Sequence, residues 1–147
     1  MTSETFPKGS VLGTVSGIFL GILLKAVENF TNQKVYTLLL NVDFIPFMGN
    51  VHWPELIEFC FHLIVSMILG LIFYHLSEKW SAGYKLRWLL AASLTLPALL
   101  LYFPLSLLAV KEVPSITNWE AVAYWGGGHL LFALSLVQLY PIIKYWK

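Results

Sequence analysis

The sequence is poor in charge and in cysteine, and each shortage excludes a class of protein. Only 12% of its 147 residues are charged, whereas soluble domains carry roughly 25%. A soluble fold of this size could not bury the apolar surface that remains, so we expect lipid surroundings. The single cysteine, Cys60, excludes a disulfide within the chain and the cysteine spacings of zinc and iron–sulfur sites. We expect Cys60 to be a buried filler of its apolar run.

Other functional signals are also missing. The net charge is +1 and the basic residues form no patch, so nucleic acid is not an expected partner. The first apolar run ends near Glu28 without the cleavage site of a secretory signal, so we expect a retained helix. No nucleophile, base and acid occur together in a catalytic pattern, so we expect a protein that is not an enzyme and has no catalytic residues.

What the sequence has in abundance is apolar residues, which make up 58% of the chain. A helix needs about 20 mainly apolar residues to cross a bilayer, and the lipid core leaves its backbone no other partner. We therefore predict an all-α membrane protein in which residues 1–147 form one domain, a four-transmembrane-helix bundle. The predicted segments lie at about 11–27, 56–76, 88–108 and 121–140.

The positions of lysine and arginine predict the orientation of this bundle. Short loops on the cytoplasmic side of a membrane carry an excess of both residues. With both termini in the cytoplasm (N-in, C-in), the inner side carries Lys8, Lys79, Lys85, Arg87, Lys144 and Lys147. The outer side then carries only Lys25, Lys34 and Lys111. The connection 29–54 lies outside in this orientation, and its apolar stretch 35–42 is expected to dip into the interface.

Glycines follow a regular spacing along the first predicted helix. Gly9, Gly13, Gly17 and Gly21 recur every four residues and therefore share one helix face, which lets another helix backbone approach closely. We favour packing within the chain. The alternatives are a homo-oligomer that meets along this face, or a membrane-protein partner that docks on it.

Polar residues line one face of the second predicted helix. Glu55, Glu58, His62 and Ser66 are spaced by three, four and four residues, which aligns them along a helix. His129 enters the fourth helix from the same side of the membrane. At 1.5 Å per residue, His62 and His129 lie about 10 and about 13 Å below the helix ends. Ionisable groups at such depth are costly and mark a candidate site.

The same outer half of the membrane holds three further polar residues, namely Lys25, Glu28 and Tyr102. The full candidate cluster is Lys25, Glu28, Glu55, Glu58, His62, Ser66, Tyr102 and His129. For each of these residues, an ordinary structural role is an alternative to a functional one. The lysine and glutamates suit interfacial anchors or a helix N-terminus. The histidines suit neutral hydrogen-bonded contacts, or groups that bind protons or a ligand.

Several of these features together resemble the YagU-like family of small bacterial inner-membrane proteins. The resemblance rests on the glycine-rich first helix ending in Lys25 and Glu28, then on the stretch His62-Leu63-Ile64-Val65-Ser66, on Phe103-Pro104-Leu105, and on Trp119-Glu120 followed by Gly128-His129-Leu130. It implies a bacterial inner membrane and a link to acid resistance, and it supplies no catalytic residues. The chain departs from that pattern in its shorter first outer connection and in Trp125, where an acidic residue is expected.

These observations lead to three functional hypotheses. The first is a non-enzymatic membrane protein tied to acid or pH stress, whose outer polar cluster gains protons. The second is a bundle that binds haem or a divalent metal through His62 and His129. Under the first hypothesis, in contrast, we expect no metal or cofactor. The third is a membrane scaffold or accessory subunit that docks through its glycine face.

Overall fold

The fold consists of helices and short connections. The computed structural model describes residues 4–43, 51 and 53–146, and these residues contain no strand. The long helices are α1 (Thr5–Thr31), α3 (Glu55–Lys79), α4 (Tyr84–Leu100) continued by α5 (Tyr102–Leu108), and α6 (Trp119–Lys144). Four spans of 27, 25, 25 and 26 residues are long and apolar enough to cross a membrane. The predicted four-helix membrane fold is confirmed, and its orientation stays a prediction.

Each helix extends beyond its predicted apolar segment. α1, for example, covers Thr5–Thr31 where the apolar run alone gave 11–27, because polar residues at both ends continue the helix into the interface. The third span is interrupted at Leu101, between α4 and α5. Pro104 accounts for this break, since a proline ring clashes with the carbonyl four residues earlier and offers no N–H to it.

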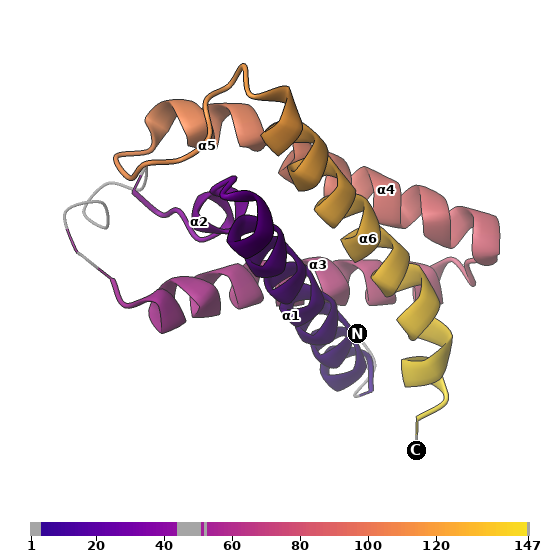
Figure 1. Cartoon of the computed structure of the whole chain (residues 1–147). Coiled ribbons are helices and arrows are strands. Elements are labelled where there is room, and N and C mark those ends of the chain that lie inside the picture. The colour runs from indigo at the N-terminus through magenta and orange to yellow at the C-terminus, as the bar shows by residue number, and fades with distance from the viewer. Residues whose placement is uncertain (1–3, 44–50, 52, 147) are drawn as a thin grey trace.

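α1 is the central helix of the bundle. It packs extensively on α3 and on α6, and α6 in turn packs on α4, whereas α3 and α6 contact each other only slightly. Both chain ends lie at one end of the bundle, while α2 (Val35–Leu39) and α5 lie toward the other (Figure 1).

The glycines of α1 bring its backbone against α3. A Cβ added to Gly13 would overlap the carbonyl oxygen of Ser66 and lie 2.8 Å from the Cα of Met67. Gly70 of α3 faces the backbone of Gly13 in the same way. The remaining glycines of this face also abut α3, at Leu71 for Gly9, Ser66 for Gly17 and Phe59 for Gly21. The glycine face is therefore covered within the chain, and it is not an open seam for a second copy or a partner.

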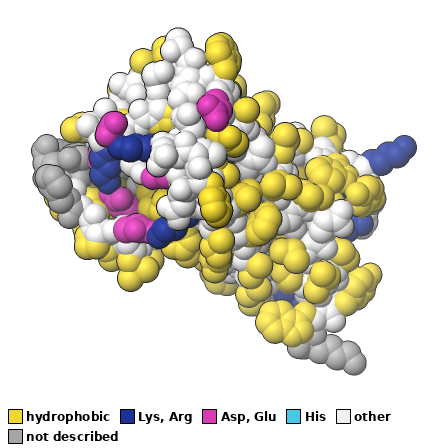
Figure 2. Space-filling model, viewed as in Figure 1, with side chains coloured by type: hydrophobic (Ala, Val, Ile, Leu, Met, Phe, Trp, Pro, Cys, Tyr) yellow, Lys and Arg dark blue, Asp and Glu magenta, His cyan; other side chains and the backbone are white. Residues whose placement is uncertain are grey.

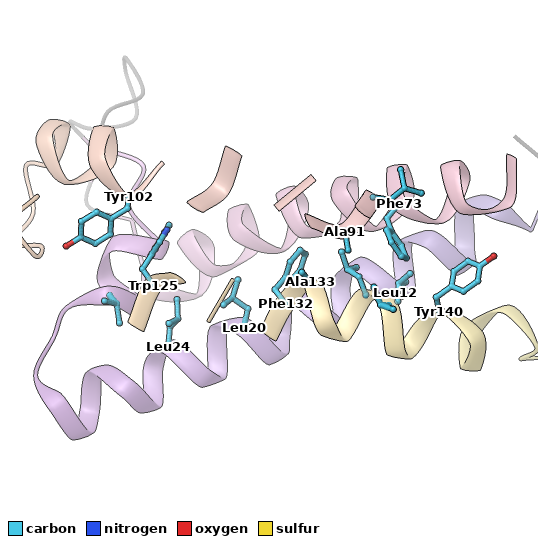
Figure 3. Packing of buried hydrophobic residues seen from close by; sticks show 14 of the residues in the cluster. Leu12, Leu20, Leu24, Phe73, Ala91, Tyr102, Trp125, Phe132, Ala133 and Tyr140 are labelled. Atoms are coloured by element: carbon cyan, nitrogen blue, oxygen red, sulfur yellow. The ribbon is translucent and has the colours of Figure 1, made fainter. Parts of the chain in front are cut away.

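The hydrophobic core lies between α1 and the helices around it. Leu12, Leu20 and Leu24 of α1 are at most 2% exposed, and Phe132 of α6 is equally buried. Figure 3 shows these side chains in one continuous row, with Tyr102 and Trp125 at one end and Phe73 and Tyr140 at the other. The row fixes the spacing of the helices that carry the candidate site.

The outer surface of the helices is apolar, as a lipid-facing surface requires. Large apolar side chains such as Ile22, Val65 and Leu89 are more than half exposed. Figure 2 shows hydrophobic side chains over the bundle and charged side chains gathered toward the end that holds α2. Cys60 belongs to the exposed set, so the expectation that it is a buried filler was wrong. The apolar run around Cys60 faces lipid on one side, which hydropathy alone does not distinguish from a core.

Candidate functional site

The first outer connection folds back onto the end of the bundle. Asn32 adopts a left-handed backbone conformation (φ 59°) that ends α1, and α2 follows. Glu28 anchors α2, since its two carboxylate oxygens accept 2.8 Å hydrogen bonds from the backbone N–H and the hydroxyl of Thr37. Val35 and Leu38 are fully buried. The stretch expected to dip into the interface thus forms a short helix packed on the protein itself.

Lys25 and Glu55 form an ion pair beside α2. The Tyr36 hydroxyl donates a 2.9 Å hydrogen bond to the same carboxylate. Burial of the Tyr36 phenol and this hydrogen bond to Glu55 raise its pKa well above the usual value. Lys25 and Glu55 are about half exposed, so their main contribution is to join α1, α2 and α3 at the outer edge.

The connection between α5 and α6 closes the same end of the bundle. Lys111 pairs with Glu58 of α3, and its backbone N–H donates a 3.0 Å hydrogen bond to Asp43. The Tyr102 hydroxyl donates to the Ser115 carbonyl at 2.9 Å. Beside these contacts lies the exposed ion pair Lys34–Glu112, in which the lysine lowers the pKa of the carboxyl.

The half-buried His62 and the buried His129 are each fixed by one backbone hydrogen bond. His62 Nε2 lies 3.0 Å from the carbonyl oxygen of Gly17, and His129 Nδ1 lies 2.8 Å from that of Trp125. A carbonyl only accepts, so these ring nitrogens carry the hydrogens and donate them. In the neutral rings, Nδ1 of His62 and Nε2 of His129 are therefore acceptors. The described residues supply no hydrogen-bond partner to either of these atoms.

The two histidines line one cavity of about 380 Å³. Of the predicted cluster, this cavity brings together Glu58, His62, Ser66 and His129. Lys25, Glu28, Glu55 and Tyr102 do not line it. Apolar side chains from α1, the α2 region and every later helix form most of the rest of its wall, namely Leu20, Leu39, Leu40, Val42, Phe61, Ile64, Val65, Leu69, Ala98, Leu101, Leu105, Trp125 and Phe132.

Asn41 adds a polar group to the cavity that the sequence did not single out. Its side chain lines the wall and is only 4% exposed. The amide oxygen accepts a 2.9 Å hydrogen bond from the backbone N–H of Asp43. The amide nitrogen has no hydrogen-bond partner among the described residues. Buried polar atoms of this kind are rare in proteins and call for an explanation.

The cavity opens sideways toward lipid. Ile64 and Val65 of α3 and Leu101 of the third span all line it, and they are 48%, 57% and 47% exposed. A residue that faces both the cavity and the lipid surface lies at its opening. A molecule dissolved in the bilayer would therefore enter the cavity between α3 and the α4–α5 junction.

Lys111 and Trp125, as well as Asn41, belong to the site although sequence reasoning missed them. In the sequence, Lys111 contributes only to the predicted orientation of the bundle. Trp125 is only a departure from the YagU-like pattern. The carbonyl of Trp125 holds His129, which is a role that any residue at this position can fill. The sequence did place Lys111 in an outer connection, and that position was the one available signal for its pairing with Glu58.

The arrangement offers binding groups and no activated nucleophile. Ser66 donates its hydroxyl hydrogen to the carbonyl of His62 at 3.0 Å, and the nearest ring nitrogen, 3.5 Å away, already donates to Gly17. Among the described residues, no three His, Cys, Asp or Glu side chains stand close enough to hold a metal ion. No protein-family model, curated protein or solved structure matches this chain.

Proposed function

We propose that this chain is a non-enzymatic, multi-pass protein of a bacterial inner membrane that responds to a fall in external pH. The observation that carries the proposal is that His62 and His129 line the same apolar cavity and that one ring nitrogen of each has no hydrogen-bond partner among the described residues. Histidine is the side chain whose charge changes most readily near neutral pH. The resemblance to the YagU-like family, with its link to acid resistance, agrees with this role.

Protonation of these rings adds charge where there is little to stabilise it. The incoming protons bind Nδ1 of His62 and Nε2 of His129, and both atoms then become donors that need an acceptor. An unpaired charge in apolar surroundings costs several kcal/mol. Two positive charges in one cavity also repel each other, so the protonated cavity favours a more open, hydrated arrangement.

Glu58 is the carboxylate that we expect to pair with the protonated histidines. It lines the cavity one helical turn before His62, and it is paired with Lys111. Among the described residues, the remaining walls, from α1, the α2 region, α4, α5 and α6, add no ionisable side chain other than His129. When the histidines gain charge, Glu58 becomes their partner, and Lys111 together with the connection around it is released.

A fluorophore on that connection tests the proposal. Val110 is 81% exposed, so Val110→Cys in a Cys60→Ser background accepts a bimane label in purified protein reconstituted into nanodiscs. We expect bimane emission to shift as the pH falls from about 7 to about 4, because the cost of charge in the cavity requires more acid than a solvated histidine does. The shift should disappear in the His62→Gln, His129→Gln double variant. His75→Gln, on α3 and outside the cavity, should keep it.

The result that contradicts the proposal is an acid-induced shift that is equally large in the double variant. A shift that survives there but disappears in Glu58→Gln would assign the response to the carboxylate alone. Survival of cells at low external pH gives a second measurement. Cells that carry the double variant should lose any protection conferred by the wild-type protein.

A bound haem or divalent metal is the alternative, and one observation favours it. The hydrogen bonds from His62 and His129 to backbone carbonyls resemble those that orient the histidine ligands of metal ions. The absorption spectrum and metal content of detergent-purified protein decide between the two. A Soret band, or one metal per chain that disappears in His129→Gln, would establish this alternative and contradict the proton response.

A further inference from the structure

The cavity has properties that proton binding alone does not require. It has an apolar wall, an opening toward lipid at Ile64, Val65 and Leu101, and a buried amide donor, Nδ2 of Asn41, that has no partner in the part of the chain that the structure describes. A proton reaches histidine through water and needs none of these features. Together they describe a binding site for a small molecule, since such sites are mostly apolar cavities of about 300–1,000 Å³ with a few placed polar groups.

The polar groups determine what kind of headgroup the cavity accepts. Asn41 Nδ2 is a donor that needs a carbonyl or ether oxygen. His129 Nε2 and His62 Nδ1 are acceptors that need an O–H or N–H. The complementary headgroup therefore carries at least one hydroxyl and a carbonyl oxygen, so that fewer buried donors and acceptors are left unsatisfied.

The charges of the site favour an uncharged headgroup. Glu58, the only carboxylate that the described residues place on the cavity wall, is neutralised by Lys111. An anionic headgroup would face Glu58, and a cationic one would compete with Lys111 for it. In apolar surroundings either arrangement leaves one charge unpaired, at a cost of several kcal/mol.

We propose that the cavity binds one molecule of an uncharged, hydroxyl-bearing membrane lipid of the monoacylglycerol class. The ester carbonyl accepts from Asn41 Nδ2, a glycerol hydroxyl donates to His129 Nε2, and the acyl chain extends through the opening between Val65 and Leu101. This inference goes beyond the proposed function, because it concerns the neutral histidines at constant pH. It holds whether or not acid opens the cavity.

Photolabelling at near-neutral pH tests the inference on the full chain in nanodiscs. The probe is a monooleoylglycerol analogue with a diazirine in its acyl chain. Mass spectrometry of the digested protein should find the label on peptides that contain Ile64, Val65 or Leu101. Unlabelled monooleoylglycerol should displace the probe at lower concentration than oleate, which is charged, or methyl oleate, which has no hydroxyl.

Variants of the two polar partners test the headgroup assignment. Asn41→Leu and His129→Phe each remove one hydrogen bond to the ligand, and we expect each to weaken labelling roughly tenfold. Asn29→Leu and His75→Phe are the matched controls, because both residues lie outside the cavity. Both controls should label as the wild type does. Thermal unfolding of every variant checks that the bundle is intact.

A third variant keeps the test decisive if a polar substitution prevents folding. Leu101→Trp narrows the opening and leaves every polar group in place, and we expect it to reduce labelling at Val65. Two results would overturn the inference. One is labelling spread over lipid-facing residues such as Ile22 and Leu89 with no peptide enriched. The other is displacement by methyl oleate as effective as that by monooleoylglycerol, which would mean that no headgroup is recognised.

Discussion

Glu58 of α3 and Lys111 of the connection before α6 form an ion pair at the edge of the cavity, with the carboxylate side chain 8% exposed and the lysine 36% exposed. The pair attaches a loop to a helix that is 53 residues earlier in the chain. It also keeps a buried carboxylate from being left unpaired. The stability of the outer end of the bundle should therefore depend on both residues together.

Lys111→Met is expected to lower the free energy of unfolding by about 2 kcal/mol. Removing one member of a fully buried pair costs about 3–5 kcal/mol, and the partial exposure of Lys111 reduces this. Glu58→Gln combined with Lys111→Met should recover most of the loss. Lys34→Met breaks an exposed pair with Glu112 and should change stability by less than about 0.5 kcal/mol. Thermal unfolding in detergent measures all three, and equal losses in Lys111→Met and Lys34→Met would contradict the expectation.

Gly13→Ile should separate α1 from α3. A side chain at Gly13 meets backbone atoms of Ser66 and Met67 that cannot move independently of their helix, so the loss should exceed the usual overpacking cost of about 1–3 kcal/mol. Gly127→Ala is the matched control, since a Cβ there meets nothing within 4 Å. It should be neutral or slightly stabilising, because alanine favours helix. The prediction is wrong if the two variants unfold at the same temperature.

The raised pKa of Tyr36 predicts a loss of stability in alkali. Because the phenol is partly buried and donates to Glu55, the folded protein retains the proton after an unfolded chain loses it near pH 10. The contribution of the protonated Tyr36 to the free energy of unfolding is complete below about pH 10, and it is lost as the pH rises through the raised pKa. Tyr36→Phe should cost less than about 1 kcal/mol at neutral pH, and the gap from wild type should narrow in alkali. Alkaline unfolding curves measure this, and a constant gap would contradict it.

Cysteine labelling tests the predicted orientation. In a Cys60→Ser background, Val110→Cys and Tyr145→Cys place single thiols at residues that are 81% and 78% exposed, at opposite ends of the bundle. With both termini in the cytoplasm, a membrane-impermeant maleimide added to intact cells should label Val110→Cys only. The opposite pattern would reverse the orientation, and the external pH would then act on the other end of the bundle.

The sequence predicted the parts of the fold that depend on local periodicity. Hydropathy gave the four spans, and the spacing of Gly9 to Gly21 gave a helix face that lies against α3. The similar depth predicted for His62 and His129 agrees with their position on one cavity. Each of these features depends on residues within a single helix.

The rest of the site depends on contacts that a single sequence does not determine. Asn41 reaches the cavity because Glu28 holds the chain that follows α1 back against the bundle. Lys111 reaches Glu58 only once the connection before α6 is folded. Lys25 and Tyr102 lie at the predicted end of the bundle but face other partners, because packing sets the rotation of each helix. The predicted and observed clusters therefore differ because the sequence alone does not determine the folded connections or the rotation of each helix.

The slight contact between α3 and α6 has a mechanical consequence. These helices carry His62 and His129, and each is attached chiefly to a different neighbour, α3 to α1 through glycines and α6 to both α1 and α4. His62 and His129 are therefore held in position relative to each other mainly through α1 and not by direct contact between their own helices. A molecule that occupies the cavity would join two helices that otherwise barely touch.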